Sequence, residues 1–397
     1  MVSIELTKQM KDFAWAVVSS RNFGQREKGG NGNLQQQYTG ILGETVVNLL
    51  ANGCLPSYNE FSITDLTIKN NDLIVATQGR ALWIIDDLTQ VQQMDPSVKS
   101  KPLHVFSVNP VLRMPPVFSR WGAMAGTPAN AAMNPLKGAV INFTANTITD
   151  SSAGSVAIYD GKKKLISRYT SSDKSNPVKL SKGSNQFVWD MQYPAAERIE
   201  DLILWTGVPG ATTAIPGNYT AVVRVDKDSV EVPFSILADP NYHCSQADYE
   251  AQHEFLVKVK GKFSETMKGI KDIRQARNQM NDFVSKQGDA CPKEVKQMAD
   301  SLSKSLTAVE EKLHQTKAKS GQDVLNFPIR LDDKLGGVYD MASSGNMAPS
   351  KQSKDVFAVL AAEVDVELAK LKSILDGGLK AFNKMVREKE LPVVVIK

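Results

Sequence analysis

Apolar residues near the start of the chain recur every three or four positions, which is the spacing of one face of an α-helix. The first row consists of Leu6, Met10, Phe13, Ala14 and Val17. A polar, glycine-rich loop over residues 22–33 follows, and a second row of the same period ends at Asn52-Gly53, a typical helix terminus. The pattern therefore predicts a helical segment over residues 1–55.

Between residues 62 and 88 the period changes from helical to alternating. Three short runs, at 62–68, 73–77 and 81–85, are separated by turn sequences of two or three residues. The first turn is Asn70 to Asp72. The pattern predicts a β-meander, and since three strands alone form a marginal sheet, we expect it to be part of a larger structure.

Residues 89–136 show little periodicity and are rich in proline, asparagine and methionine. The prolines are Pro96, Pro102, Pro110, Pro115, Pro116, Pro128 and Pro135. This composition favours a long linker that lies across neighbouring domains and has no core of its own.

Residues 137–238 are predicted to form an immunoglobulin-like β-sandwich, because they hold seven short strand-like runs within about 100 residues. Asp160-Gly161 and Pro216-Gly217 are turn sequences between such runs. We expect Trp189 and Trp205 to fill the space between the two sheets. The runs are 140–143, 155–159, 164–168, 186–189, 202–205, 219–225 and 230–236.

Residues 246–391 return to helical spacing and predict an antiparallel bundle of four helices. The four apolar rows begin at Leu256, Val295, Leu331 and Phe357. Pro328 stands at a favoured first-turn position of the third helix, and the fourth continues past Gly377-Gly378. The predicted fold class is multi-domain α+β, with N-terminal helices, a meander, a sandwich and a C-terminal bundle.

Composition limits the classes of function. Of the 397 residues, 42% are apolar and 23% charged, which supports folded cores and argues against general disorder. Lys and Arg total 47 against 43 Asp and Glu, so the net charge of +4 does not indicate nucleic acid or an anionic membrane as a partner. The three cysteines, Cys54, Cys244 and Cys291, are too few and too scattered for a disulfide framework.

No run of 18 apolar residues predicts a membrane span, and residues 1–15 lack the continuous apolar core of a secretory signal. We expect either a protein that stays inside the cell or a chain that lacks its original start. The sequence leaves the compartment open.

Candidate catalytic and metal-binding residues are sparse. The sequence contains no Walker A loop, GxSxG or HExxH motif. His243, Cys244 and His253 are the tightest group of metal-binding types, but a metal needs three or four converging ligands, so we expect ordinary polar surface and no cofactor. Asp86 and Asp87 are adjacent at a strand end and point to opposite faces, which is typical of a strand terminator rather than a catalytic pair.

Four stretches match a known family: Asp65–Leu88 (DLTIKNNDLIVATQGRALWIIDDL), Phe187–Asp190, Pro216–Tyr219 and Gln315–Leu331. With them, the chain from about Ser62 to its end resembles the C-terminal region of bacterial BNR-repeat, sortilin-like β-propeller proteins, which are often labelled glycosyl hydrolases. The resemblance implies that residues 62–88 are a partial blade that closes a large propeller. A propeller needs several four-stranded blades, and the sequence holds one incomplete blade and no SxDxGxxW box.

A second resemblance concerns the first 55 residues. Arg21–Gln37 (RNFGQREKGGNGNLQQQ), followed by Gly40–Glu44 (GILGE), resembles the start of PD-(D/E)XK restriction-type nucleases. The resemblance implies a helical Glu, a hairpin Asp and an acid-x-Lys that together hold Mg²⁺ and position water. Glu44 and Asp65 match the first two, but the strand Leu73–Thr77 supplies neither acid nor lysine. We expect Glu44 to lie on a helix surface, and the basic glycine-rich loop to be solvated rather than bound to phosphate.

These patterns predict a non-catalytic interaction or scaffolding portion of a propeller protein, with a protein or glycan as partner and without nucleic acid. Trp121, Trp205 and the loop Thr206–Pro216 are the candidate binding residues, and Trp121 is expected to be tucked under its irregular segment. Because the two resemblances meet between Gly53 and Ser62, we expect a fusion or a truncated reading frame. Two alternatives stay open: a glycosyl hydrolase-family protein whose catalytic propeller is missing, and a degenerate nuclease.

Overall fold

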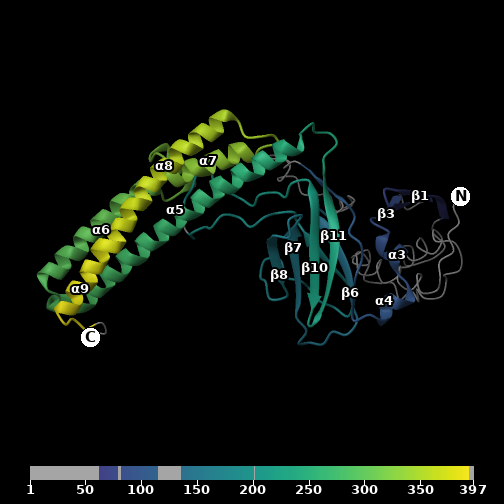
Figure 1. Cartoon of the computed structure of the whole chain (residues 1–397), viewed down its shortest axis with the longest axis horizontal. Helices are drawn as coiled ribbons and strands as arrows, with labels where there is room; N and C mark the ends of the chain where they lie inside the picture. Colours follow the sequence, from purple (N-terminus) through teal and green to yellow (C-terminus); the bar gives the residue numbers. More distant parts are fainter. Residues whose placement is uncertain (1–61, 79–81, 115–135, 201, 393–397) are drawn as a thin grey trace. The chain divides into compact units, whose positions relative to one another are not determined.

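The computed structural model describes residues 62–78, 82–114, 136–200 and 202–392. It shows a mixed α+β protein with several sheets and a C-terminal helical region (Figure 1), which confirms the predicted fold class at that level. The chain divides into two compact units. The first contains all of the described strands, and the second contains Gln192–Ile215 and the residues from Asp239 onward. The helices predicted over residues 1–55 lie outside the described residues.

The first unit begins with a three-stranded antiparallel sheet. Its strands, in spatial order, are β1 Ser62–Lys69, β2 Asp72–Gln78 and β3 Leu82–Ile85. The predicted turn between β1 and β2 is confirmed, because Asn70 and Asn71 have φ angles of 52° and 69° and Lys69 pairs with Asp72. Two successive positive φ angles are what a two-residue type I′ hairpin requires, and asparagine tolerates them well.

Both faces of this small sheet carry apolar side chains. Leu73, Val75 and Ile85 share one face and are buried. Ile84 and Leu82 lie on the other face and remain 47% and 68% exposed. Antiparallel sheets at a protein surface usually have one apolar and one polar face, so a sheet that is apolar on both sides is suited to a neighbour on each side.

The segment between this sheet and the sandwich is structured, so the predicted proline-rich linker over residues 89–136 is wrong for residues 89–113. It contains α3 Thr89–Gln93, α4 Pro96–Ser100, β4 Leu103–Val105 and β5 Val111–Arg113. Elements of three to five residues are too short to produce a visible period, which explains the error. Residues 115–135 lie outside the described part of the chain.

Asp87 connects the meander to this segment. Its Oδ1 accepts hydrogen bonds from Asn71 Nδ2 at 3.1 Å, Asn109 Nδ2 at 2.8 Å and Thr89 N at 3.0 Å. β3 ends at Ile85, so the two aspartates follow the strand end as predicted. The carboxylate of Asp87 therefore has a structural role in holding a turn.

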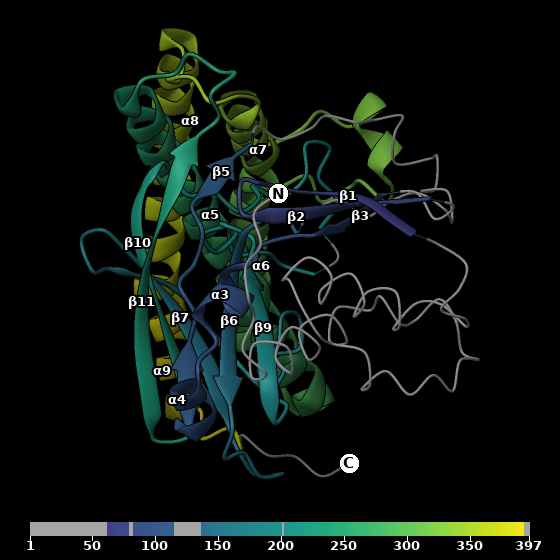
Figure 2. The ribbon, with the colours of Figure 1, turned by 90° about the vertical axis from the view of Figure 1, so that its right-hand side faces the viewer.

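Two further sheets form a sandwich (Figure 2). The larger has the order β5-β11-β10-β7-β8 and the smaller β4-β6-β9. Every pair in them is antiparallel except β5 with β11, which is parallel. The remaining strands are β6 Ala139–Ala145, β7 Gly154–Asp160, β8 Leu165–Thr170, β9 Gly183–Trp189, β10 Gly217–Val225 and β11 Asp228–Ala238.

An aromatic cluster lies between these two sheets. Trp189 on β9 is fully buried, and its ring centroid is 5.7 Å from that of Tyr219 on β10 and 6.0 Å from that of Phe234 on β11. The predicted inter-sheet role of Trp189 is confirmed. The same prediction for Trp205 is wrong: residues 202–205 form no strand, and Trp205 belongs to the second unit with 56% of its surface exposed.

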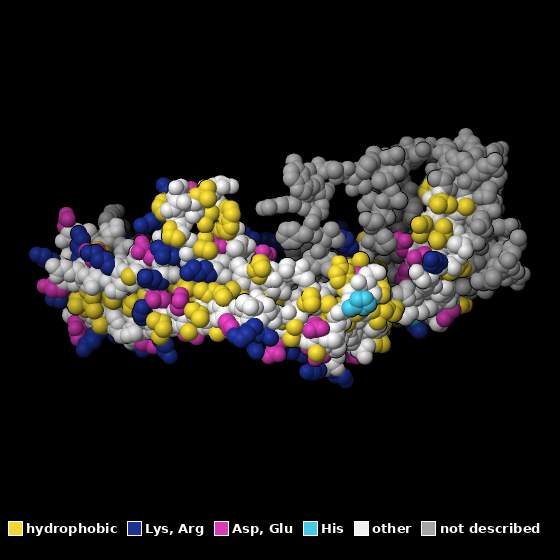
Figure 3. Space-filling view, turned by 90° about the horizontal axis from the view of Figure 1, so that it is seen from above, with side chains coloured by type: hydrophobic (Ala, Val, Ile, Leu, Met, Phe, Trp, Pro, Cys, Tyr) yellow, Lys and Arg dark blue, Asp and Glu magenta, His cyan; other side chains and the backbone are white. Residues whose placement is uncertain are grey.

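The second unit is built on long helices. They are α5 Gln246–Gln287, α6 Lys293–Leu313, α7 Leu331–Ser343, α8 Lys351–Ser373 and α9 Lys380–Glu388. α5 contacts α6, α7 and α8, and the predicted apolar rows form their shared core. On the face shown in Figure 3, Lys, Arg, Asp and Glu lie between bands of hydrophobic side chains over this helical part, at the left.

The fourth predicted helix continues past Gly377-Gly378, as expected, but through a π-helical turn at Ile374–Leu379. A Cβ at Gly378 would lie 2.4 Å from Leu302 Cδ2 on α6. The lack of a side chain at Gly378 allows the π-helical turn to approach α6 closely. The helix continues through both glycines in this turn and does not end at them.

Candidate functional site

The residues between β9 and β10, 192–215, leave the sandwich and fold back on themselves within the second unit. We call this segment the strap. Gln192 and Thr213 form an isolated antiparallel bridge, Tyr193 N donates to Thr212 O at 2.9 Å, and Ala196 N donates to Pro209 O at 3.3 Å. The strap thus satisfies part of its own backbone without forming a regular hairpin.

One arm of the strap is bound to α5. Lys260 Nζ donates to Pro194 O at 2.6 Å, and Glu197 N donates to Ser264 Oγ at 3.1 Å. Burial lowers the pKa of Lys260, which is consistent with an ammonium group taken out of water by the strap. These contacts fix the position of the first arm.

The other arm is held by one carboxylate at the start of α7. Trp205 N donates to Asp333 Oδ2 at 2.9 Å, and Thr206 N donates to Asp333 Oδ1 at 2.8 Å. Thr206 Oγ1 lies 2.7 Å from Asp333 Oδ1 and 2.8 Å from Asp333 O. Asp333 is buried, and hydrogen bonds from amides are what a buried carboxylate requires. The backbone of Trp205 is therefore locked in place.

Close packing reinforces this arm. A Cβ at Gly336 of α7 would lie 2.4 Å from Thr206 Oγ1 and 2.8 Å from Gly207 O, so only glycine permits the approach. Farther along, Tyr339 donates from its hydroxyl to Gly210 O at 2.9 Å. Burial raises the pKa of Tyr339, so its hydroxyl stays a donor.

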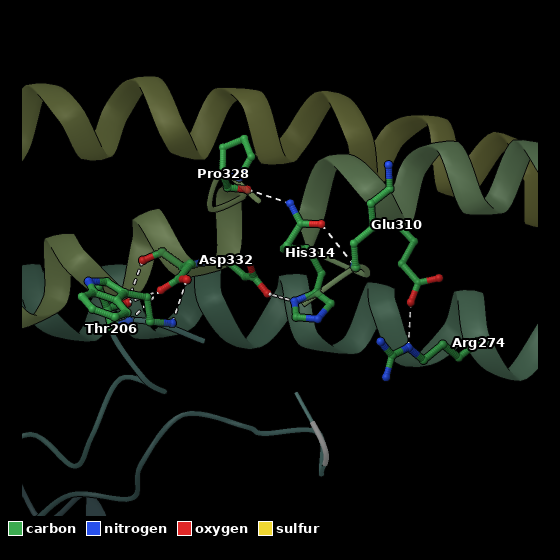
Figure 4. Close-up of polar contacts among 10 residues, drawn as sticks. Thr206, Arg274, Glu310, His314, Pro328 and Asp332 are labelled. Carbon is green, nitrogen blue, oxygen red and sulfur yellow. Dashed lines mark hydrogen bonds and ion pairs between the residues drawn. The ribbon is translucent and has the colours of Figure 1, made fainter. Parts of the chain in front are cut away.

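The residue before Asp333, Asp332, forms a buried pair with His314 (Figure 4). His314, which caps α6, has Nδ1 2.7 Å from Asp332 Oδ2, and Asp332 Oδ1 accepts from Asp333 N at 2.7 Å. Burial raises the pKa of Asp332, and His314 opposes that effect. One turn earlier on α6, buried Glu310 lies 2.7 Å from both Arg274 Nε and Arg277 Nη1 of α5. The His314–Asp332 pair ties the start of α7, on which Asp333 stands, to the end of α6, and Glu310 ties α6 to α5.

The resulting site presents the ring of Trp205 to solvent from a backbone that cannot move freely. A tryptophan offers a large apolar face and one N–H donor, which suits it to stacking on a sugar ring or filling a pocket of a partner. A contact group fixed before binding loses less conformational entropy when it binds.

The structure describes only some of the other residues that were considered as site candidates. Trp121 and Glu44 lie outside the described residues. His253 lies against Tyr193, with ring centroids 4.6 Å apart. Among the described residues no group of three or more His, Cys, Asp or Glu could hold a metal ion.

Sequence reasoning identified Trp205 and the loop that begins at Thr206 but missed Asp333 and Gly336. Asp332-Asp333 stands in the first turn of α7, where acidic residues usually complement the helix dipole at the surface. Only the buried position of both aspartates distinguishes them from such a pair, and the sequence alone carries no sign of it.

Comparisons with known proteins do not show which family this chain belongs to. No protein-family model matches it, and no curated protein matches its sequence. One solved structure that it matches is "pT26-6p", at 12% sequence identity and a TM-score of 0.14, over 60% of this chain and 48% of that chain. A likeness at that level carries no argument about fold or function. In the described part of the chain, no helix is long and apolar enough to cross a membrane.

Proposed function

We propose that this chain is a non-catalytic interaction and scaffolding module in which Trp205 is a pre-positioned contact for a glycan or protein partner. The observation that carries the proposal is the contrast at this residue. Its side chain is 56% exposed, while its amide and that of Thr206 are bound by the buried carboxylate of Asp333. A merely solvent-exposed tryptophan would not need such a support.

We also propose that the chain corresponds to the C-terminal portion of a BNR-repeat, sortilin-like β-propeller protein. The apolar character of both faces of the β1–β3 sheet supports this, because a propeller blade is packed between two others. The exposed face, which carries Leu82 and Ile84, would then pack on a neighbouring blade.

In the same proposal the sandwich is immunoglobulin-like and the helical unit an antiparallel bundle. The sandwich supports this by its strand order. If β4 and β5 are the two halves of strand A, then β6 and β9 take the places of B and E, and β7, β10 and β11 those of C, F and G. The parallel pairing of β5 with β11 fits the first and last strands of such a fold.

The binding proposal is tested with the full chain on a glycan array and on a displayed peptide library. We expect at least one ligand in one of the two pools, and its binding should fall at least tenfold in Trp205→Ala. The matched control is Leu325→Ala, because Leu325 is a 79% exposed apolar residue of the same unit. Absence of a ligand in both pools, or a ligand that Trp205→Ala does not weaken, would overturn the proposal.

A second variant tests the role of the Asp333 carboxylate rather than that of the Trp205 ring. Asp333→Ala keeps Trp205 but removes the acceptor of the Trp205 and Thr206 amides. We expect weaker binding through a faster dissociation rate, because the ring must be ordered at the moment of binding. Binding kinetics identical to the parent chain would mean that the carboxylate only stabilises the fold.

A further inference from the structure

A continuous series of hydrogen bonds connects the end of α6 to the strap (Figure 4). His314 Nδ1 lies 2.7 Å from Asp332 Oδ2, and Asp332 Oδ1 accepts from Asp333 N at 2.7 Å. The carboxylate of Asp333 in turn accepts from the amides of Trp205 and Thr206. A change at His314 can therefore reach the backbone of Trp205 through two consecutive carboxylates.

All three ionisable groups of this series are buried. Asp332 is 0% exposed, and His314 and Asp333 are 4% and 5% exposed. Two charged carboxylates on consecutive residues repel each other, and the repulsion is stronger where water is excluded. A proton held between His314 and Asp332 reduces the negative charge of the series by one. The number of protons on this pair therefore decides how much negative charge lies at the start of α7.

The buried carboxylates of the neighbouring helices already have basic partners. On α6, Glu310 stands one turn before His314 and binds two arginines of α5 at 2.7 Å. On α8, which also packs on α7, Glu367 binds Lys370 at 2.7 Å. Neither ion pair contains a histidine, so both should keep their charges across the neutral pH range.

The charged groups that act on Asp332 directly are His314 and Asp333. Burial raises the pKa of Asp332 most, His314 lowers it through a hydrogen bond and its charge, and the charge of Asp333 raises it. The part of the strap around Trp205, residues 202–208, contains no ionisable side chain. A titration of this cluster near neutral pH therefore belongs to His314 and Asp332 as a pair.

We propose that His314 is a positioning residue for the Trp205 site, and that one proton shared between His314 and Asp332 keeps the strap in place. With this proton, the pair and Asp333 together carry a single negative charge, and Asp333 stays aligned with the strap amides. When the pH rises and the proton leaves to solvent, two adjacent buried carboxylates are charged, and the start of α7 loosens. The regulation of binding rests on the proposed function of Trp205, whereas the loosening of the strap does not.

Hydrogen exchange of the strap amides measures this loosening in the full chain without any ligand. The protection of the Trp205 and Thr206 amides, corrected for the intrinsic effect of pH, should fall about tenfold between about pH 6 and pH 9. That factor corresponds to about one unit of pKa difference between the bound and the released strap. The amide of Glu197 is the internal control, because it donates to Ser264 Oγ on α5, and its protection should stay constant.

Two substitutions separate the effect of the proton from that of the hydrogen bonds. His314→Asn keeps a donor near the position of Nδ1 but cannot be protonated, so the strap amides should be weakly protected at both pH values. Asp332→Asn removes one of the two carboxylates and keeps an acceptor for Asp333 N, so the strap amides should be strongly protected at both. Circular dichroism checks that each variant keeps its helix content.

Opposite behaviour of the two variants supports the proposal. Protection of the Trp205 and Thr206 amides that does not depend on pH in the parent chain overturns it, and so does an unchanged pH dependence in His314→Asn. Weak protection at both pH values in Asp332→Asn also overturns it, because the charge of Asp332 would then be needed to hold Asp333. Absence of a glycan or peptide ligand would overturn the proposed function alone, since the exchange measurement uses none.

Discussion

The interior of the sandwich and the interior of the helical unit are stabilised by different kinds of interaction. The space between the two sheets is filled by Trp189, Tyr219 and Phe234, which need only each other's surfaces. The helical unit buries charges as well, namely Glu310 with two arginines and the adjacent Asp332 and Asp333. The stability of an apolar core falls when a side chain loses volume. The stability of a core with buried charges falls when a charge loses its partner, and it also depends on pH.

The largest effect is expected at the apolar core. Trp189→Ala should lower the free energy of unfolding of the sandwich by about 4 kcal/mol, because it leaves a large cavity between the sheets. Urea unfolding, with hydrogen exchange to locate the loss, measures this. Trp205→Ala is the matched control, and since that ring is exposed its effect should stay within about 0.5 kcal/mol. If both variants lost the same free energy of unfolding, the two tryptophans would not differ in their contribution to stability, and the prediction would be wrong.

The next effect separates lost partners from lost volume. Replacing Arg274 and Arg277 by Met leaves Glu310 buried without a partner, and should cost the helical unit about 3 kcal/mol. Adding Glu310→Met should recover most of that loss, because no charge then remains to be buried. Urea unfolding of the double and triple variants measures the difference. If the triple variant is no more stable than the double, packing rather than charge explains the loss.

A smaller effect concerns the approach of the strap to α7. Gly336→Ala should destabilise the helical unit by about 2 kcal/mol, because its methyl group would overlap Thr206 and the backbone of Gly207. At the neighbouring Gly337 a Cβ would lie 3.5 Å from the nearest atom, so Gly337→Ala should be neutral or stabilising. Thermal unfolding of the pair tests the idea. If the two variants had the same melting temperature, the strap would have moved to accommodate the methyl group at position 336 at little cost in stability.

The smallest effect is a difference in pH dependence. Burial raises the pKa of Asp332, so the folded unit holds that proton to a higher pH than the unfolded chain does. The stability this contributes is present below about pH 4 and is lost as the pH rises through the raised folded pKa. Asp332→Asn keeps a neutral side chain and should make the loss of stability between pH 4 and pH 8 smaller than in the parent chain. Urea titrations at the two pH values compare the slopes, and identical slopes in both proteins would contradict the assignment.

The sequence predicted the long elements and not the short or irregular ones. The apolar rows of α5, α6 and α8, the turn that begins at Asn70 and the buried Trp189 all follow from local patterns that the structure confirms. β4 and β5 were missed because strands of three residues give no period.

The error at residues 202–205 has another cause. The apolar run there lies between strand-like runs and so predicts a strand, but the amides of Trp205 and Thr206 at its end donate to Asp333, more than a hundred residues away. Only tertiary structure reveals such a partner. Only part of the candidate site could therefore be predicted. The sequence identifies the aromatic residue, Trp205, but not Asp333, the carboxylate that binds its amide.

The path of the strap has a consequence for biosynthesis. Residues 192–215 emerge from the ribosome between two sandwich strands, yet the helix that anchors them is completed only at Ser343. During that interval the amides of Trp205 and Thr206 lack their acceptor, and β5 has no β11 beside it until residue 238 is made. Neither unit corresponds to one uninterrupted stretch of the chain. A fragment that starts at Asp239 would therefore contain every long helix of the described residues but not the segment that binds Asp333.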